Sequence, residues 1–330
     1  MTALWESLYW QGRVLIGLLL AGLLAAPLVA DRYVISVLIT VFYFAFVGQA
    51  WNLMMGFAGQ LSLGHALYAG LGGYVAALLF VKFGIGPLLG VFPAIVVATL
   101  SGAVVGWLGF RFSIAGVYFA LLTIAFAEFT RIGFNHLEIA GASGGLFLPV
   151  GAGEWWNLRG DQLLFYYLGL GLVIAAVLLV ARIRRTRLGL QWLAVREDPE
   201  AARAVGIPVF RVKMMAVLIS SAMTAVGGVF LAFYNNNLFP DRVFDVSRSI
   251  ELIMAPIVGG LGTVFGPVVG AFILTPLGEA LMALTESFGL NAPGTKAVFY
   301  GLALMLIIAV QPGGVWPWLA RVLGLGGRRQ

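Results

Sequence analysis

Long apolar runs separated by short polar breaks dominate the chain. Between Arg32 and Lys82 there is no Asp, Glu, Lys or Arg, and similar runs lie on both sides of one polar stretch, residues 182–213. A bilayer core about 30 Å thick needs about 20 helical residues to cross it. The pattern predicts an all-α, polytopic transmembrane helical bundle of about ten spans. We place these spans at 14–30, 33–51, 65–81, 83–110, 112–134, 163–181, 214–234, twice within 250–284, and at 297–310.

The composition supports a membrane protein. The 330 residues are 61% hydrophobic and only 10% charged, whereas soluble domains carry about 25% charged residues. The first apolar run is read as an uncleaved span, because Pro27–Ala30 matches a signal-peptide cleavage site poorly. There is no cysteine, which excludes disulfides, Cys-ligated metals and a Cys nucleophile. Two isolated histidines, His65 and His136, do not form a metal site, so we expect no metal and no cofactor.

The charge distribution predicts the topology. Residues 182–213 carry eight basic and three acidic side chains, and the positive-inside rule places such a loop in the cytoplasm. Ten spans then put both termini in the cytoplasm. We expect a single transmembrane domain, 1–330, in the inner membrane of a prokaryote. We interpret the net charge of +6 as a topology signal and expect no nucleic-acid partner.

Within this loop the sequence predicts a short helix with marked ends. Asp198 is a good N-cap, and Pro199 suits the first helical position. Glu200 favours the positive end of the helix dipole. Gly206 can adopt the left-handed conformation that ends a helix, and Pro208 prevents its continuation. Two interpretations remain: the helix docks into a partner protein, or it lies on anionic lipid.

Two glycine-rich segments predict broken helices. Non-helical backbone at membrane depth is tolerated only where it is buried in protein or lines an aqueous cavity, and paired breaks in two halves of a transporter point to its path. The alternative is close helix packing, as through Gly266 and Gly270. The candidate path residues are Gly59, Gln60, Ser62, His65, Gly259, Gly260, Gly262 and Thr263.

A few charged residues fall inside predicted spans, where such groups are costly and count as functional candidates. Glu128 and Arg131 are three residues apart on one helix, so an intrahelical pair is the simplest interpretation. The alternative is a role in gating or in contact with a binding protein. Arg248 can pair with Glu251 in the same way. Glu279 is a further candidate, deeper in a predicted span.

Several blocks of sequence resemble one family. The run 56–74, GFAGQLSLGHALYAGLGGY, is similar to the signature of branched-chain amino acid (Liv-type) ABC permeases. Residues 123–128 with Arg131, the segment 185–207, and 259–263 followed by 266–267 resemble further blocks of that family. The segment 141–146 resembles its external loop, with variants at Ala142 and Gly144. The blocks are closer to the LivM-type subunit than to the LivH-type subunit.

The resemblance implies a function and a set of partners. Glu200-Ala201-Ala202-x-x-x-Gly206 is similar to the EAA---G loop that docks into the nucleotide-binding subunits of ABC importers. The implied assembly has two ATP-binding subunits, a second homologous permease of LivH type and an extracytoplasmic substrate-binding protein. It carries leucine, isoleucine and valine. The expected coupling residues are Arg187, Gly189, Asp198, Glu200, Ala201, Ala202 and Gly206.

The sequence is also compatible with other functions. A permease for urea or short-chain amides is a close relative of the implied importer. An autonomous secondary transporter would instead use the membrane glutamates as relays. The chain has no phosphate-binding loop of the form Gly-x-x-x-x-Gly-Lys-Ser/Thr, so we expect ATP hydrolysis on other subunits. It also lacks a convincing catalytic constellation, so we do not expect an enzyme.

Overall fold

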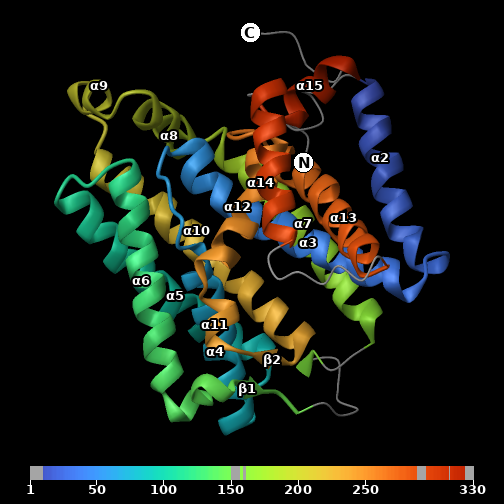
Figure 1. Cartoon of the computed structure of the whole chain (residues 1–330). Helices are drawn as coiled ribbons and strands as arrows, with labels where there is room; N and C mark the ends of the chain where they lie inside the picture. The colour runs from blue at the N-terminus through green and yellow to red at the C-terminus, as the bar shows by residue number, and fades with distance from the viewer. Residues whose placement is uncertain (1–9, 150–156, 159–160, 288–294, 312, 324–330) are drawn as a thin grey trace.

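The computed structural model describes residues 10–149, 157–158, 161–287, 295–311 and 313–323, and these are almost entirely helical (Figure 1). Seven helices in this part of the chain are long and apolar enough to cross a membrane. The prediction of an all-α membrane bundle is therefore confirmed. These helices are α3 (Arg32–Asn52), extended by one π-helical turn η2 (Leu53–Phe57), α4 (His65–Phe83), α5 (Pro87–Arg111), α6 (Val117–His136), α7 (Gln162–Ile183), α10 (Val209–Asn235) and α13 (Gly266–Ser287).

Three shorter helices occupy the other predicted spans. They are α2 (Trp10–Ala25), α12 (Val246–Gly259) and α14 (Thr295–Val310), of 14 to 16 residues. The predicted division of residues 250–284 into two helices is confirmed, because α12 ends at Gly259 and α13 begins at Gly266. Since these three helices are shorter than a full membrane crossing of about 20 residues, the total of ten spans stays a prediction.

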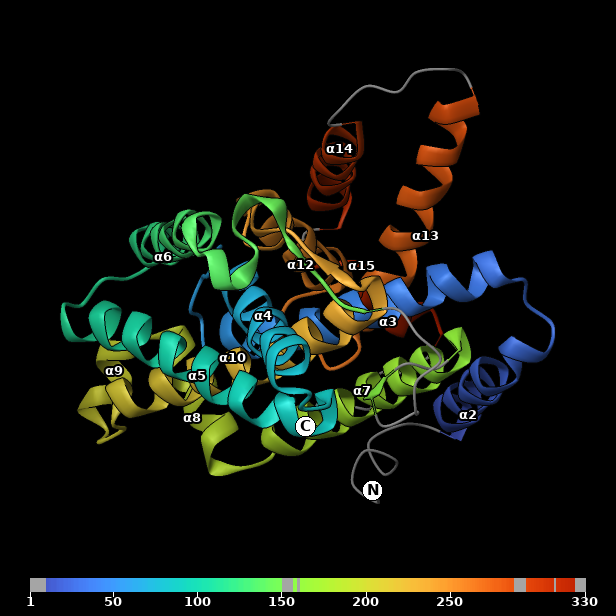
Figure 2. The same ribbon diagram turned by 90° about the horizontal axis from the view of Figure 1, so that it is seen from below.

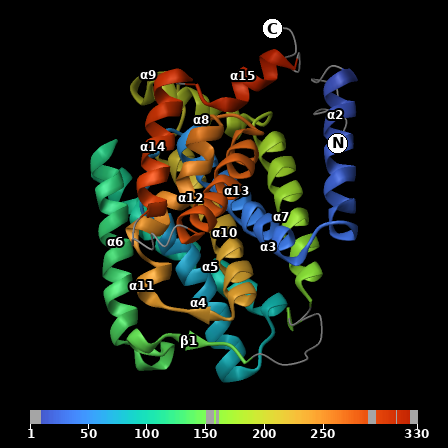
Figure 3. The ribbon, with the colours of Figure 1, turned by 45° about the vertical axis from the view of Figure 1, so that its right-hand side comes forward.

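The bundle has two distinct ends. One end carries α8 (Arg187–Glu197), α9 (Pro199–Ala204) and α15 (Val315–Val322), and we call it the α8–α9 end. The opposite end, the β1–β2 end, carries the short strands β1 (Leu146–Phe147) and β2 (Asn237–Leu238) and the helix α11 (Pro240–Val243) (Figures 1 and 3). The strands are antiparallel and pair Leu146 with Leu238. The remaining short turns are η1 (Ala26–Leu28), η3 (Glu138–Ala140) and η4 (Ala142–Gly144).

Helices α3, α4 and α10 form the interior, and the others surround them. α10 crosses α4 closely because small residues face each other: a Cβ added at Gly228 would lie 1.9 Å from the carbonyl oxygen of Ala69. Such contacts bring membrane helices together without a hydrophobic driving force. Outer helices expose large apolar side chains, among them Phe92, Trp107 and Phe129, as expected for a surface that faces lipid. Seen from the β1–β2 end, α13 and α14 extend away from the other helices (Figure 2).

The predicted polar stretch is shorter than its sequence suggests. α7 continues to Ile183 and α10 begins at Val209, so the non-spanning part covers 184–208 rather than 182–213. Lys213 lies within α10, with its Nζ 5.8 Å from the ring centroid of Phe110. Because the long aliphatic stem of a lysine packs on apolar surface, this charge does not end the helix.

Candidate functional site

The two glycine-rich segments lie against each other at the α8–α9 end. After η2, residues 58–64 lead into α4, and residues 260–265 separate α12 from α13. The Asn52 side chain joins the two: its Nδ2 donates to the Thr263 carbonyl at 2.8 Å, and its Oδ1 accepts from the Gly262 N–H at 2.8 Å. A Cβ at Gly56 would lie 2.5 Å from the Gly262 nitrogen. The segments therefore form one packed unit although about 200 residues separate them.

The second segment satisfies its backbone through side chains. Thr263 Oγ1 donates to the Gly260 carbonyl at 2.8 Å and accepts from the Gly266 N–H at 3.0 Å, which caps α13. Gln49 Nε2 donates to the Val264 carbonyl at 2.5 Å. The glycines are required by space, because a Cβ at Gly259 would lie 1.7 Å from the Gly266 carbonyl oxygen. The break between α12 and α13 is therefore stabilised by specific contacts within the protein.

His65 is the centre of a buried hydrogen-bond chain and is fully enclosed, with an exposed fraction of 0%. Ser220 Oγ donates to the Ala50 carbonyl at 2.7 Å and therefore accepts from His65 Nε2, 2.8 Å away. That tautomer leaves Nδ1 as the acceptor from Ser62 Oγ at 3.0 Å. Trp51 Nε1 donates to the Ser62 carbonyl at 2.7 Å. In this conformation His65 and Ser62 hold α3, α4 and α10 together.

Gln60 and Gly59 complete the first segment. Gln60 is buried, and its Nε2 donates to the Ala58 carbonyl at 2.8 Å. Gly59 has a φ of +69° and lies beside α8, since a Cβ there would be 3.1 Å from the Arg196 Cγ. Glycine is therefore favoured at position 59 for two reasons: the backbone is left-handed, and α8 approaches it closely.

Arg196 of α8 contacts both glycine-rich segments. Its Nη1 donates to the Gly56 carbonyl at 2.5 Å, and a Cβ at Gly262 would lie 2.8 Å from the same nitrogen. The sequence marked Arg196 only as one positive charge among eight. This side chain makes a direct connection between the helix pair α8–α9 and the joined segments.

The predicted capped helix is present as α9. The Asp198 side chain accepts from the N–H groups of Glu200 and Ala201 at 2.8 and 3.0 Å, which confirms it as the N-cap. Gly206 has a φ of +85°, as expected for the residue that ends the helix. Ala202 is buried, with an exposed fraction of 4%, whereas Ala201 is exposed. Glu200 forms an exposed ion pair with Arg203 at 3.0 Å.

A second helix, α8, precedes α9 and is not among the elements predicted from the sequence. Arg187 is its first residue, and Thr186 is its N-cap, accepting from Gly189 N–H at 3.4 Å. Gly189 packs on the end of α7, where a Cβ would lie 2.3 Å from the Ile183 carbonyl oxygen. Trp192 is fully buried and donates from Nε1 to the Val212 carbonyl at 2.8 Å. α8 is therefore fixed to α7 and α10 and gives α9 a rigid base.

The charged pair on α6 extends to a third residue. Arg131 binds Glu128 through two bonds, of 2.9 Å from Nε and 2.5 Å from Nη2, which confirms the intrahelical pair. Arg131 Nη1 also pairs with Asp241 of α11, and Asn135 Nδ2 donates to the same carboxylate at 2.7 Å. The hydrogen bond from Asn135, followed by that from Arg131, holds the pKa of Asp241 below its usual value. The cluster fixes α11 to α6 at the β1–β2 end.

The other membrane acids lie on α12 and α13. Glu251 accepts from Arg248 Nη1 at 2.7 Å, as the sequence predicts. Glu279 is half-buried on α13. A functional role for Glu279 stays a prediction.

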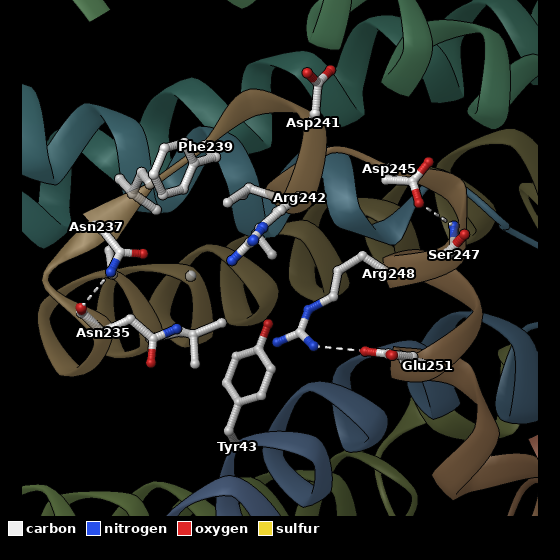
Figure 4. A pocket seen from close by; sticks show the side chains of 16 residues that line it. Tyr43, Asn235, Asn237, Phe239, Asp241, Arg242, Asp245, Ser247, Arg248 and Glu251 are labelled. Atoms are coloured by element: carbon white, nitrogen blue, oxygen red, sulfur yellow. Dashed lines mark hydrogen bonds and ion pairs between the residues drawn. The ribbon is translucent and has the colours of Figure 1, made fainter. Parts of the chain in front are cut away.

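A cavity of about 380 Å³ lies at the β1–β2 end. Its walls come from β2, α11 and the start of α12 on one side, and from α3, α4 and α10 on the other. Figure 4 shows its charged side chains, including Arg242, Asp245 and Arg248. Arg242 and Asp245 were not predictable as site residues, because charged residues next to a span resemble those of ordinary interfacial loops.

These features together define a multi-pass α-helical membrane protein whose two interrupted segments are joined and contact an exposed capped helix pair. A profile of the family described as "Branched-chain amino acid transport system / permease component" matches residues 33–310. The chain belongs to this family.

Curated relatives agree with this assignment. The high-affinity branched-chain amino acid transport system permease protein LivM of Escherichia coli K12 is 26% identical over 313 residues, covering 87% of this chain and 71% of the relative. LivM of Salmonella typhimurium is 28% identical, covering 82% and 67%. LivH of Escherichia coli K12 is 26% identical, covering 82% and 90%. No solved structure matches the chain.

Proposed function

We propose that this chain is a membrane-spanning subunit of an ABC importer for branched-chain amino acids in the inner membrane of a prokaryote. Support comes from the family assignment and from relatives of both permease types. The proposed assembly contains a second, LivH-type permease, two ATP-binding subunits and an extracytoplasmic substrate-binding protein. ATP hydrolysis takes place on the ATP-binding subunits. In this arrangement the α8–α9 end and both termini face the cytoplasm, because most basic residues gather there.

The surface of α9 suits docking into an ATP-binding subunit. Its outward side presents Ala201 and Ala204, followed by Val205 with an exposed fraction of 77%. Glu200 and Arg203 form a polar edge beside them. Small and apolar residues bordered by charges are typical of a compact element that enters a groove on a partner.

One observation carries the proposal: Arg196 connects this docking element to both glycine-rich segments. A movement imposed on α8–α9 by ATP binding would be transmitted to Gly56 and Gly262 through a single side chain. In the interrupted segments side-chain hydrogen bonds replace the helical ladder, and such paired breaks point to the substrate path of a transporter. The coupling route is thus α9, α8, Arg196 and the joined segments.

The test replaces Arg196 and separates ATP hydrolysis from transport. In the complete transporter in proteoliposomes, Arg196→Gln is expected to lower ATP-driven leucine uptake about tenfold or more. That change corresponds to losing one charge-assisted hydrogen bond of about 1.5–3 kcal/mol. ATP hydrolysis and co-purification of the ATP-binding subunits should persist. Arg211→Gln, which removes an exposed arginine at the same end, is the matched control. Equal uptake by both variants would refute the coupling route.

A further inference from the structure

The cavity at the β1–β2 end has two guanidinium groups directed into it. Figure 4 shows Arg242 from α11 and Arg248 from α12 extending toward the same space, with the Tyr43 hydroxyl beside them. We call this space the Arg242–Arg248 pocket. It is about 380 Å³ in volume, within the range of about 300–1,000 Å³ that is typical of small-molecule sites.

The deeper cation, Arg248, is rigidly held. Its Nη1 donates to Glu251 at 2.7 Å, and its guanidinium lies 5.4 and 5.2 Å from the ring centroids of Tyr43 and Phe44. Only about a quarter of its side chain is exposed. Glu251 occupies one edge of the planar group, and the rest of the guanidinium faces aromatic rings and the cavity. A guanidinium fixed in this way is pre-organised to bind a planar anion.

The outer cation, Arg242, differs because it has no acidic partner within 4.0 Å among the described residues. Its guanidinium lies 5.5 Å from the ring centroid of Phe239. Asp241, its neighbour in sequence, also lines the pocket, but its carboxylate extends away from the Arg242 guanidinium (Figure 4) and is bound by Arg131 and Asn135. Asp245 is occupied in part, since its Oδ2 caps α12 through the Ser247 N–H at 3.2 Å. Arg242 is therefore available for an anionic group that enters the pocket.

Part of the pocket lining is apolar. It comprises Leu231 of α10, Leu238 of β2 and Val243 of α11, together with the small residues Ala69 and Gly228. One space thus combines a cationic side, carboxylates at its edge and an aliphatic wall. This combination is complementary to a zwitterion that has an apolar side chain.

We propose that the Arg242–Arg248 pocket receives the free amino acid during import, with its carboxylate on the two arginines and its aliphatic side chain on the Leu231–Leu238 wall. The ammonium group lies toward Asp245 and Glu251. This inference rests on the proposed function and adds the site in this chain that holds the substrate, with its anchoring residues. Arginine binds a carboxylate through two parallel charge-assisted hydrogen bonds, whereas urea or a neutral amide offers no charge to the pair. The pocket therefore favours amino acids over amides.

Arg242 is the residue to vary, because it is exposed and its replacement leaves the ion pairs of Arg131 and Arg248 intact. The assay is ATP-driven uptake of radiolabelled leucine by the complete transporter, with the binding protein supplied in the external medium. Uptake is expected to decrease in the order wild type, Arg242→Lys, Arg242→Gln and Arg242→Glu. The glutamine variant should lose about ten- to a hundredfold. Arg32→Gln, which removes an exposed arginine at the start of α3 outside the pocket, should keep wild-type uptake.

A second readout separates substrate binding from docking of the binding protein. ATP hydrolysis stimulated by the binding protein should remain within about twofold of wild type in the glutamine variant. A matching loss of this stimulation would assign Arg242 to a docking surface and overturn the pocket. Uptake that is unchanged in Arg242→Glu would overturn it as well. If the wild-type transporter shows no ATP-driven leucine uptake at all, the proposed function itself fails, and that result is seen before any variant is compared.

Discussion

The hydrogen bonds of Asn52 provide the sharpest test of how the two glycine-rich segments are joined. Asn52→Ala removes both the donor to the Thr263 carbonyl and the acceptor for the Gly262 N–H, each at 2.8 Å. The residue lies at the end of α3 and is fully buried, so water does not readily replace the lost partners. The Thr263 carbonyl and the Gly262 N–H of the second segment then lose these hydrogen bonds.

Two limits bound the destabilisation expected for Asn52→Ala. Side-chain hydrogen bonds in membrane proteins contribute about 0.6 kcal/mol each on average, which gives about 1.2 kcal/mol for the pair. Leaving a buried polar group unsatisfied costs about 1–3 kcal/mol. We therefore expect a destabilisation of about 1–4 kcal/mol, which changes the unfolding equilibrium constant by about fivefold to several hundredfold.

The measurement is reversible denaturation of the purified chain in mixed micelles, followed by tryptophan fluorescence. Gln162→Ala is the matched control, because it also removes a carboxamide side chain and its hydrogen bond to the Arg32 carbonyl is exposed. The control should change the free energy of unfolding by less than about 0.5 kcal/mol. If Asn52→Ala were no more destabilised than this control, Asn52 would not join the segments.

Two further predictions address helix packing and pH. Gly228→Ala places a Cβ 1.9 Å from the Ala69 carbonyl oxygen and should destabilise the chain by about 1–3 kcal/mol or more. The control Gly171→Ala, at a position with open space, should change stability little. Equal effects of the two substitutions in the same denaturation assay would contradict the close crossing of α4 and α10. Because the pKa of Asp241 is lowered in the folded protein, its contribution to stability is present above its unfolded pKa of about 3.9 and is lost as the pH falls through the folded value. The difference in melting temperature between wild type and Asp241→Asn should thus be constant from about pH 7 to 5 and decrease below about pH 4, and a difference that persists unchanged at pH 2 would be inconsistent with the ion pair.

Local signals in the sequence predicted the local features of the fold. Charge-free runs located the helices, and the run of glycines near residue 260 located the division between α12 and α13. Asp198 and Gly206 correctly marked the ends of α9, because capping depends on residues within one turn of the helix. The Glu128–Arg131 pair was predictable for the same reason.

Contacts between distant parts of the chain were not predictable from one sequence. In the sequence Asn52 is an ordinary polar residue, and its role depends on a partner 210 positions away. Arg196 is one of many cations, and its role depends on a partner 140 positions away. The partner of His65, Ser220, lies 155 positions along the chain. Arg242 was not predictable as a site residue, and Arg248 was predictable only as the partner of Glu251, because the pocket depends on how α11 and α12 turn toward α3. Periodicity and capping contain no information on such pairings.

The importer assignment requires that this permease moves amino acids only when separate subunits hydrolyse ATP. Proteoliposomes with ATP inside and leucine-loaded binding protein outside test it directly, prepared with and without the ATP-binding subunits. We predict uptake that requires these subunits and hydrolysable ATP and that is insensitive to ionophores. Leucine uptake by the permeases alone, driven by an ion gradient, would contradict the claim and would make Glu128, Glu251 and Glu279 the residues to investigate next.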